Sequence, residues 1–221
     1  MRDILPSEIV DALRDRYLAG VADAEAGFAS ARADEDSLTG ALGQALSRRP
    51  EMKFSSGNAD YAVKVDWVKL RGRGLNAPEK LYGPDGIFQI EIIDEWGQVI
   101  RRKALPFQAK TNWKGTNPAL AKQCRDINKS LGSGIVVNFT ANGYEVCSTK
   151  AAAQRAGRHG LVKEAGLLKP LGQLLGNEFL DCTVGRIGLF YDPDAEQFIG
   201  EDGNPLEPAN AITTVIRRGS R

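Results

Sequence analysis

The stretch ALPFQAK, residues 104–110, decides how the rest of the chain is interpreted. Side chains in a β-strand alternate between two faces, so Gln108 and Lys110 share one face and the apolar residues share the other. Asp85 follows Pro84 directly and precedes Gln108 by 23 residues, so it can bring a carboxylate to the polar face. A carboxylate, an amide oxygen and an ammonium group are what binding a divalent cation beside a phosphate requires.

The pattern of residues 51–110 predicts several strands, and the motif lies at the end of the last of them. Tyr61, Val63, Val65 and Trp67 alternate with more exposed types, and residues 87–93 form a second apolar run. Turns are indicated at 55–58, 72–74, 83–86 and 94–97.

Helices are expected both before and after these strands in the sequence. A long helix runs to about residue 30, and a second one is marked by an apolar stripe that ends before Arg49-Pro50. The stripe consists of Leu38, Ala41, Leu42, Ala45 and Leu46. Beyond the motif we expect a helix at 118–129, strands at 134–139 and 144–147, helices near 149–157 and 170–180, a late strand at 185–191, and an irregular tail from Asp192.

This order predicts an α/β fold with a central mixed β-sheet flanked by helices. A single domain is expected, since the 42% hydrophobic content of 221 residues can bury a sizeable core. Its parts are an N-terminal helical segment at 1–33, a core at 34–147, and a C-terminal segment at 148–221 packed on that core.

Charge is unevenly distributed, although the formal net charge is only +1. Residues 1–60 hold eleven acidic and seven basic residues, whereas residues 101–129 hold eight basic residues and Asp126 as the one acid. The basic segment surrounds the motif, which predicts that a polyanion docks there. The alternative is an ordinary solvated basic face.

Other classes of protein are disfavoured by the sequence. Apolar runs are too short to span a membrane and no signal peptide is indicated, so we expect a cytoplasmic protein. Three widely spaced cysteines suit buried thiols better than disulfides or zinc. His159 is the single histidine and is expected in a loop, which argues against histidine-based nucleases. Phosphate-loop and nucleophile-elbow motifs are missing.

Pro84-Asp85 and the Gln-Ala-Lys motif at 108–110, with an acidic helix before them, resemble the PD-(D/E)xK nuclease superfamily in its Gln variant, as in Mrr-type restriction endonucleases. The strings at 77–80, 83–86 and 107–110 further resemble nuclease domains of antiphage defence systems. The resemblance covers residues 34–147. It implies a restriction-endonuclease-like sheet and phosphodiester hydrolysis with Mg²⁺ or Mn²⁺, usually on DNA.

Physical roles can be assigned to the motif residues beside that resemblance. Asp85 is a candidate metal ligand, and Gln108 can add an uncharged oxygen, so another carboxylate is needed. Lys110 can orient the attacking water or neutralise the phosphate. Glu35 is the preferred extra carboxylate, but Asp34 and Glu79 stay open as alternatives, and the acidic run at 34–36 also suits a helix start.

Candidate nucleic-acid-binding residues surround the site: Arg71, Arg73, Lys80, Trp113 and Lys114. Trp113 can stack on a base, but a place in the core is the favoured alternative. Glu91 shares the face of Asp85 on its strand but lies too far along it for the site, so it is expected to be structural.

The expected function is therefore that of a Mg²⁺-dependent endodeoxyribonuclease, with defence against foreign DNA as its setting and with a homo-oligomer or a defence-system partner. The alternative is a non-catalytic nucleic-acid-binding or scaffold module, which Gln108 favours because an amide binds metal more weakly than a carboxylate. These residues do not distinguish DNA from RNA.

Overall fold

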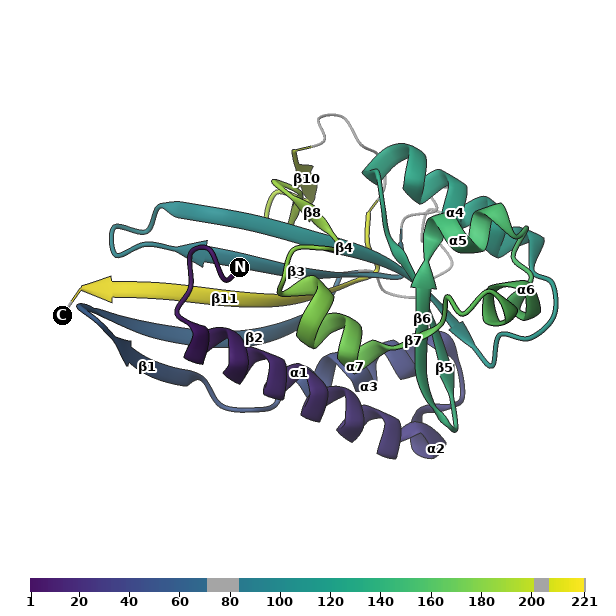
Figure 1. The fold of residues 1–221 in the computed structure, drawn as a ribbon, viewed down its shortest axis with the longest axis horizontal. Coiled ribbons are helices and arrows are strands. Elements are labelled where there is room, and N and C mark those ends of the chain that lie inside the picture. Colours follow the sequence, from purple (N-terminus) through teal and green to yellow (C-terminus); the bar gives the residue numbers. More distant parts are fainter. Residues whose placement is uncertain (71–83, 201–206, 221) are drawn as a thin grey trace.

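The computed structural model describes residues 1–70, 84–200 and 207–220. Within them a nine-stranded sheet forms the centre of the molecule, in the order β1-β2-β11-β3-β4-β5-β6-β7, with β8 paired to β4 (Figure 1). The strands are β1 (Met52–Ser56), β2 (Ala59–Lys69), β3 (Gly86–Ile93), β4 (Val99–Thr111), β5 (Ile135–Thr140), β6 (Gly143–Ser148), β7 (Lys169–Pro170), β8 (Arg186–Ile187) and β11 (Asn210–Ser220). A separate hairpin joins β9 (Phe190–Asp192) to β10 (Gln197–Ile199).

The sheet is mixed, because β11 runs parallel to β3 and β4 runs parallel to β5 while the other pairs are antiparallel. Helices cover both faces (Figure 1). They are α1 (Ser7–Ala26), α2 (Phe28–Ala31), α3 (Glu35–Ser47), α4 (Pro118–Leu131), α5 (Thr149–Gln154), α6 (His159–Glu164), α7 (Leu171–Gln173) and a π-helical turn η1 (Leu174–Phe179). The predicted α/β fold, a central mixed sheet flanked by helices, is confirmed.

The main core lies between the sheet and the helices α1, α3, α7 and η1 that cover one of its faces. It takes Leu105, Phe107 and Ala109 from β4, as the alternation of side chains predicted. α3 packs closely on β2, since a Cβ atom on Gly43 would lie 2.3 Å from Cδ1 of Trp67. This contact fixes α3 and therefore the position of Glu35 at its start.

A second apolar cluster lies on the opposite face, under α4, α5 and α6. It includes Trp113, Cys124, Val136, Cys147 and Val162. The predicted helix at 118–129 and the two strands after it are confirmed as α4, β5 and β6. The helix predicted near 149–157 ends earlier, at Gln154, and the short α6 follows it.

The prediction of an irregular tail from Asp192 was wrong, since the short strand β10 and the long strand β11 both lie within it. β11 is eleven residues long, lies between β2 and β3, and pairs with both. Ile212 and Ile216 point into the main core, and Thr214 forms a 2.7 Å hydrogen bond with the hydroxyl of Tyr17. The late strand predicted at 185–191 is also interrupted, because Gly188 has φ of 86° between β8 and β9.

In the described part of the chain, none of the helices combines the length and the apolar character that crossing a membrane requires.

Candidate functional site

Asp85 lies directly before β3 and next to the motif at the end of β4. Its Oδ2 atom accepts a 2.7 Å hydrogen bond from the backbone N–H of Ala109 and another from the side-chain amide of Gln108. The close approach depends on Gly86, whose partner in the ladder is Phe107. A Cβ atom on Gly86 would lie 2.2 Å from Cζ of that ring. Sequence reasoning therefore paired Asp85 and Gln108 correctly in space.

The side-chain amide of Gln108 is hydrogen-bonded through its nitrogen but not through its oxygen. The side chain is 2% exposed, and its Oε1 atom is buried without a hydrogen-bond partner among the described residues. Buried acceptors are normally satisfied, so an orphan at this position needs an explanation. Gln89, a buried glutamine on β3, shows the usual state: its amide nitrogen donates to the Tyr191 carbonyl, and its oxygen accepts from the Tyr191 N–H.

An oxygen-seeking cation fits these two residues. Mg²⁺ is usually held by one or two carboxylates with water completing its shell. Asp85 would supply the carboxylate and Gln108 the orphan oxygen. Over the described ranges, no group of three or more His, Cys, Asp and Glu side chains is placed to hold a metal ion.

Glu35 and Lys110 form the second half of the site. Lys110 Nζ lies 2.8 Å from Glu35 Oε2, and Glu35 Oε1 accepts a 3.2 Å hydrogen bond from the Thr111 N–H. The carboxylate therefore holds both the ammonium group and the backbone at the end of β4. Glu35 therefore positions Lys110 directly.

The three acidic residues at 34–36 each have a different role. Asp34 caps α3 by accepting a 2.7 Å hydrogen bond from the Ser37 N–H. Asp36 pairs with Lys69 at 2.5 Å. Glu35 is the member that reaches the motif. Glu79, the other candidate carboxylate, lies outside the described residues.

Sequence reasoning missed Asn210, the first residue of β11. Its side-chain amide donates a 2.9 Å hydrogen bond to the backbone carbonyl of Asp85, and its oxygen accepts one from the Trp67 indole at 3.3 Å. Asn210 is buried, so this link ties β2 and β11 to the residue that carries the carboxylate. The run of β-branched residues at 212–216 was the signal that a strand begins here.

The basic segment at 101–129 does not form one positive surface, because its first three cations are buried or paired. Docking of a polyanion beside the motif stays a prediction. Lys103 is fully buried, where its ammonium group donates to the Phe179 carbonyl, and burial lowers its pKa to about 8. Arg101 pairs with Asp3 and Arg102 with Glu91, each at 2.6 Å. These three residues precede the motif on a strand of thirteen residues, which carries them away from Lys110.

Trp113 is not placed to stack on a base. It is 4% exposed, its indole N–H donates to the Gly157 carbonyl at 3.1 Å, and its ring belongs to the second apolar cluster. The core alternative is thus the correct one, because the chain turns over β5 after Thr111 and carries the ring inward. Lys114 is exposed, whereas Arg71, Arg73 and Lys80 lie outside the described residues.

The cysteines and the histidine do not offer a nucleophile at this site. Burial raises the pKa values of Cys124 and Cys147 to about 12. His159 begins α6 instead of lying in a loop, and its ring packs edge-on against Trp113 at 5.1 Å between ring centroids. Its Nε2 atom is 3.8 Å from Glu145 Oε2.

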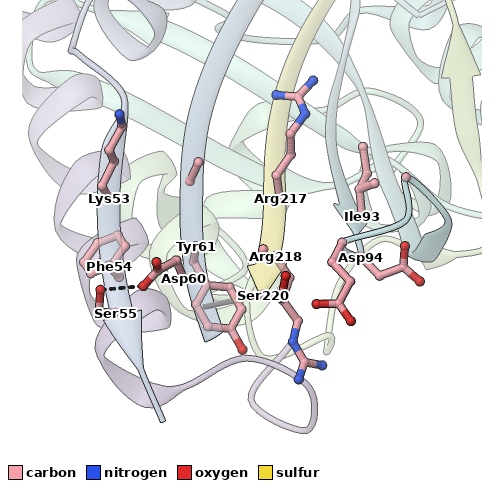
Figure 2. Close-up of a pocket in the computed structure, with 14 residues that line it drawn as sticks. Lys53, Phe54, Ser55, Asp60, Tyr61, Ile93, Asp94, Arg217, Arg218 and Ser220 are labelled. Carbon is pink, nitrogen blue, oxygen red and sulfur yellow. Dashed lines mark hydrogen bonds between the residues drawn. The ribbon is translucent and has the colours of Figure 1, made fainter. Parts of the chain in front are cut away.

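A separate cavity of about 750 Å³ lies at the opposite ends of the strands (Figure 2). It is lined by residues of β1, β2, β3 and β11, and Asp60 is hydrogen-bonded there to Ser55 at 2.6 Å. Figure 2 shows the guanidinium groups of Arg217 and Arg218 pointing apart. Ile93, on its wall, is eight residues beyond Asp85, roughly 26 Å at about 3.3 Å per strand residue. This cavity is therefore remote from the motif.

No family model matches the chain, and searches of curated proteins and of solved structures found no significant match. The functional assignment therefore rests on the geometry of the site.

Proposed function

We propose that this protein is a metal-dependent nuclease that hydrolyses phosphodiester bonds in DNA, a Gln variant of the PD-(D/E)xK type with a restriction-endonuclease-like core. One observation carries the proposal: the orphan, buried Oε1 atom of Gln108 lies beside the Asp85 carboxylate, two residues from a lysine held by Glu35. Thr111 Oγ1 is a second buried atom without a partner among the described residues, three positions further along the chain.

Asp85 and Gln108 would hold a Mg²⁺ or Mn²⁺ ion. When bound, such an ion lowers the pKa of a coordinated water and offsets charge on the scissile phosphate. Lys110 directs the attacking water and stabilises the negative charge on the phosphate oxygens in the transition state, a task that suits a compact cation. Glu35 keeps the ammonium group in place, and Asn210 fixes the backbone of Asp85.

Cleavage of supercoiled plasmid by the purified protein tests the proposal. We expect nicked and linear products with Mg²⁺ or Mn²⁺ and none with EDTA. Parallel incubation with RNA of matched sequence shows whether the protein distinguishes deoxyribose from ribose in its substrate. If neither polymer is cut at millimolar concentrations of either ion, the nuclease proposal fails.

Replacing Gln108 with glutamate probes the metal site directly. Without metal, Gln108→Glu places two carboxylates side by side in a buried position and removes the amide donor, which is expected to destabilise the fold by about 1–3 kcal/mol. With Mg²⁺ we expect the loss to be recovered and the ion to bind more tightly than in the wild type. Thermal melting in EDTA and in Mg²⁺ measures both effects.

Gln89→Glu is the matched control for that substitution. Gln89 is equally buried, but its amide is already satisfied by Tyr191 and Thr213. It should lose stability in the same way and recover nothing with Mg²⁺. An equal response of both variants to the ion would argue against a metal site at Gln108.

A non-catalytic DNA-binding module is the second candidate, and one observation favours it. Glu35 is engaged by Lys110 and Thr111, so its carboxylate is already used within the protein. Titration calorimetry separates the two functions: no uptake of Mg²⁺ or Mn²⁺ at millimolar concentration, with DNA binding intact, supports the module. A role in antiviral defence, with a homo-oligomer or a partner protein, and a cytoplasmic location stay predictions.

A further inference from the structure

The segment after β6 carries an uninterrupted positive charge. Residues 146–163 contain no Asp or Glu but contain Lys150, Arg155, Arg158 and Lys163. Lys150, Arg158 and Lys163 are exposed, and Arg155 lies against α6, where its Nε donates to the Leu161 carbonyl at 3.2 Å. Together with Lys114, the three cations at 155–163 are called here the α6 surface.

The α6 surface is fastened to the chain that leaves the motif. The His159 N–H donates to the Gly115 carbonyl and the Asn117 N–H to the Gly157 carbonyl, both at 2.9 Å, and Thr116 forms a β-bridge with Arg158. Gly157 permits this approach: its φ is 68°, and a Cβ atom would lie 2.0 Å from the Asn117 carbonyl oxygen. The loop that follows Lys110 is thereby held against α6.

The distance from the motif to this surface is short. Lys114 is four residues after Lys110, which limits the separation of their Cα atoms to about 14 Å even in a fully extended chain. The bridge between Thr116 and Arg158 brings the second cation beside the same loop. Lys114 and Arg158 are therefore the two cations of the α6 surface that the chain holds near the motif.

Three cations of the α6 surface have no carboxylate partner among the described residues. Within residues 1–70, 84–200 and 207–220, no ion pair is formed by Lys114, Arg158 or Lys163. By contrast, Arg101, Arg102 and Lys122 are each paired with a carboxylate. Unpaired, exposed cations are available to neutralise phosphates.

The aromatic residues argue for a duplex over a single strand. Proteins that bind single strands stack successive bases on exposed aromatic rings. Phe107 and Trp113, the aromatic residues that flank the motif in sequence, are both buried. Trp96, which is 76% exposed, lies in the turn between β3 and β4 at the far ends of those strands. The described part of this surface thus offers charge without stacking, which suits contacts to a phosphate backbone.

We propose that the α6 surface binds the phosphate backbone of duplex DNA and lays one strand across the candidate site, without reading base sequence. The inference rests on the proposed function for its purpose, but the binding itself is independent of cleavage.

Fluorescence anisotropy with a 20-bp duplex in EDTA tests the surface without catalysis. The full chain carrying Lys114→Gln and Arg158→Gln should bind at least ten times more weakly at 100 mM salt. The slope of log affinity against log salt should fall by about 1.8, since each lost phosphate contact contributes about 0.9. A single strand of the same length should bind the wild type more weakly than the duplex does.

Arg217→Gln with Arg218→Gln is the matched control. It removes the same charge from two exposed arginines at the remote cavity (Figure 2). We expect its affinity to stay within about twofold of the wild type. If both pairs weaken binding equally, or if the α6 pair does not weaken it, the inference is overturned.

Two further results keep the test decisive. If circular dichroism shows that the double variant does not fold, Lys114→Gln alone is used. That side chain is exposed and has no hydrogen bond or ion pair with the described residues. An unchanged affinity of this single variant for DNA then contradicts the inference. If the wild type binds DNA through this surface but cuts neither DNA nor RNA, the surface stands and the nuclease proposal fails.

Discussion

Substituting Asp85 with asparagine is expected to lower Mg²⁺-dependent cleavage of DNA by more than about a hundredfold. Losing even an outer-sphere partner of a metal ligand typically costs 10–100-fold, and Asp85 is the carboxylate that would contact the ion. Asparagine keeps the size of the side chain, and its amide oxygen can still accept the 2.7 Å hydrogen bond from the Ala109 N–H. The loss should therefore appear in activity and metal binding without unfolding.

Metal-dependent stability provides the second measurement for Asp85→Asn. An ion that binds only the folded state stabilises it by about 2.7 kcal/mol at a hundred times its dissociation constant. The wild type should show this increase with Mn²⁺ in thermal melts, and the variant should show little of it. Asp126→Asn, on an exposed carboxylate of α4 that pairs with Lys122, is the control. Full cleavage by the Asp85 variant would remove Asp85 from the site.

Local sequence patterns predicted the parts of the fold that depend on neighbours along the chain. The alternation in β2 and β4 gave the buried faces, and the stripe from Leu38 to Leu46 placed α3 on the sheet. The pairing of Asp85 with Gln108 was also predictable, because β3 and β4 are consecutive strands joined by a short turn. These contacts need only strand periodicity and a hairpin.

The position of β11 needed information that local patterns lack. It pairs in parallel with β3, more than one hundred residues earlier in the chain, and it follows a stretch rich in Pro, Gly and acidic residues. Parallel neighbours are joined by long connections, so their pairing leaves no local signature. Asn210 was missed for the same reason, since its role depends on the strand order.

Burial of polar and aromatic residues was the other limit. Lys103 and Trp113 lie on either side of the motif and looked like part of a binding surface. The structure buries both, Lys103 against Phe179 and Trp113 under α5 and α6. A count of charges along the chain assumes that each side chain reaches solvent. In β4 that assumption fails for seven consecutive residues, from Lys103 to Ala109.

The contacts of Glu35 change how charge is distributed over the site. A glutamate that binds metal would add negative charge beside Asp85, whereas here it balances Lys110 and accepts from Thr111. The ammonium group is thus preorganised, and Gln108 would give a bound ion fewer charged ligands than a carboxylate in its place would. Without DNA, such a site is expected to bind Mg²⁺ weakly. Once DNA is bound, its phosphate adds oxygen ligands and the ion is expected to bind more tightly. In the proposed mechanism, the main catalytic role therefore falls to Lys110.

Lys110→Ala is accordingly expected to reduce the cleavage rate by about 10²–10³-fold, the usual cost of removing one preorganised group that stabilises transition-state charge. Metal binding at Asp85 should be retained, which separates this variant from Asp85→Asn. Lys110→Arg should not restore activity, because the planar guanidinium group does not replace a compact ammonium group held by one carboxylate. Lys64→Ala, on a 52% exposed lysine of β2, controls for loss of positive charge. Rates from plasmid cleavage at saturating Mg²⁺ decide the matter. If Lys110→Ala cuts as fast as Lys64→Ala, the motif lysine has no role in the chemistry, and the resemblance to nucleases loses its physical support.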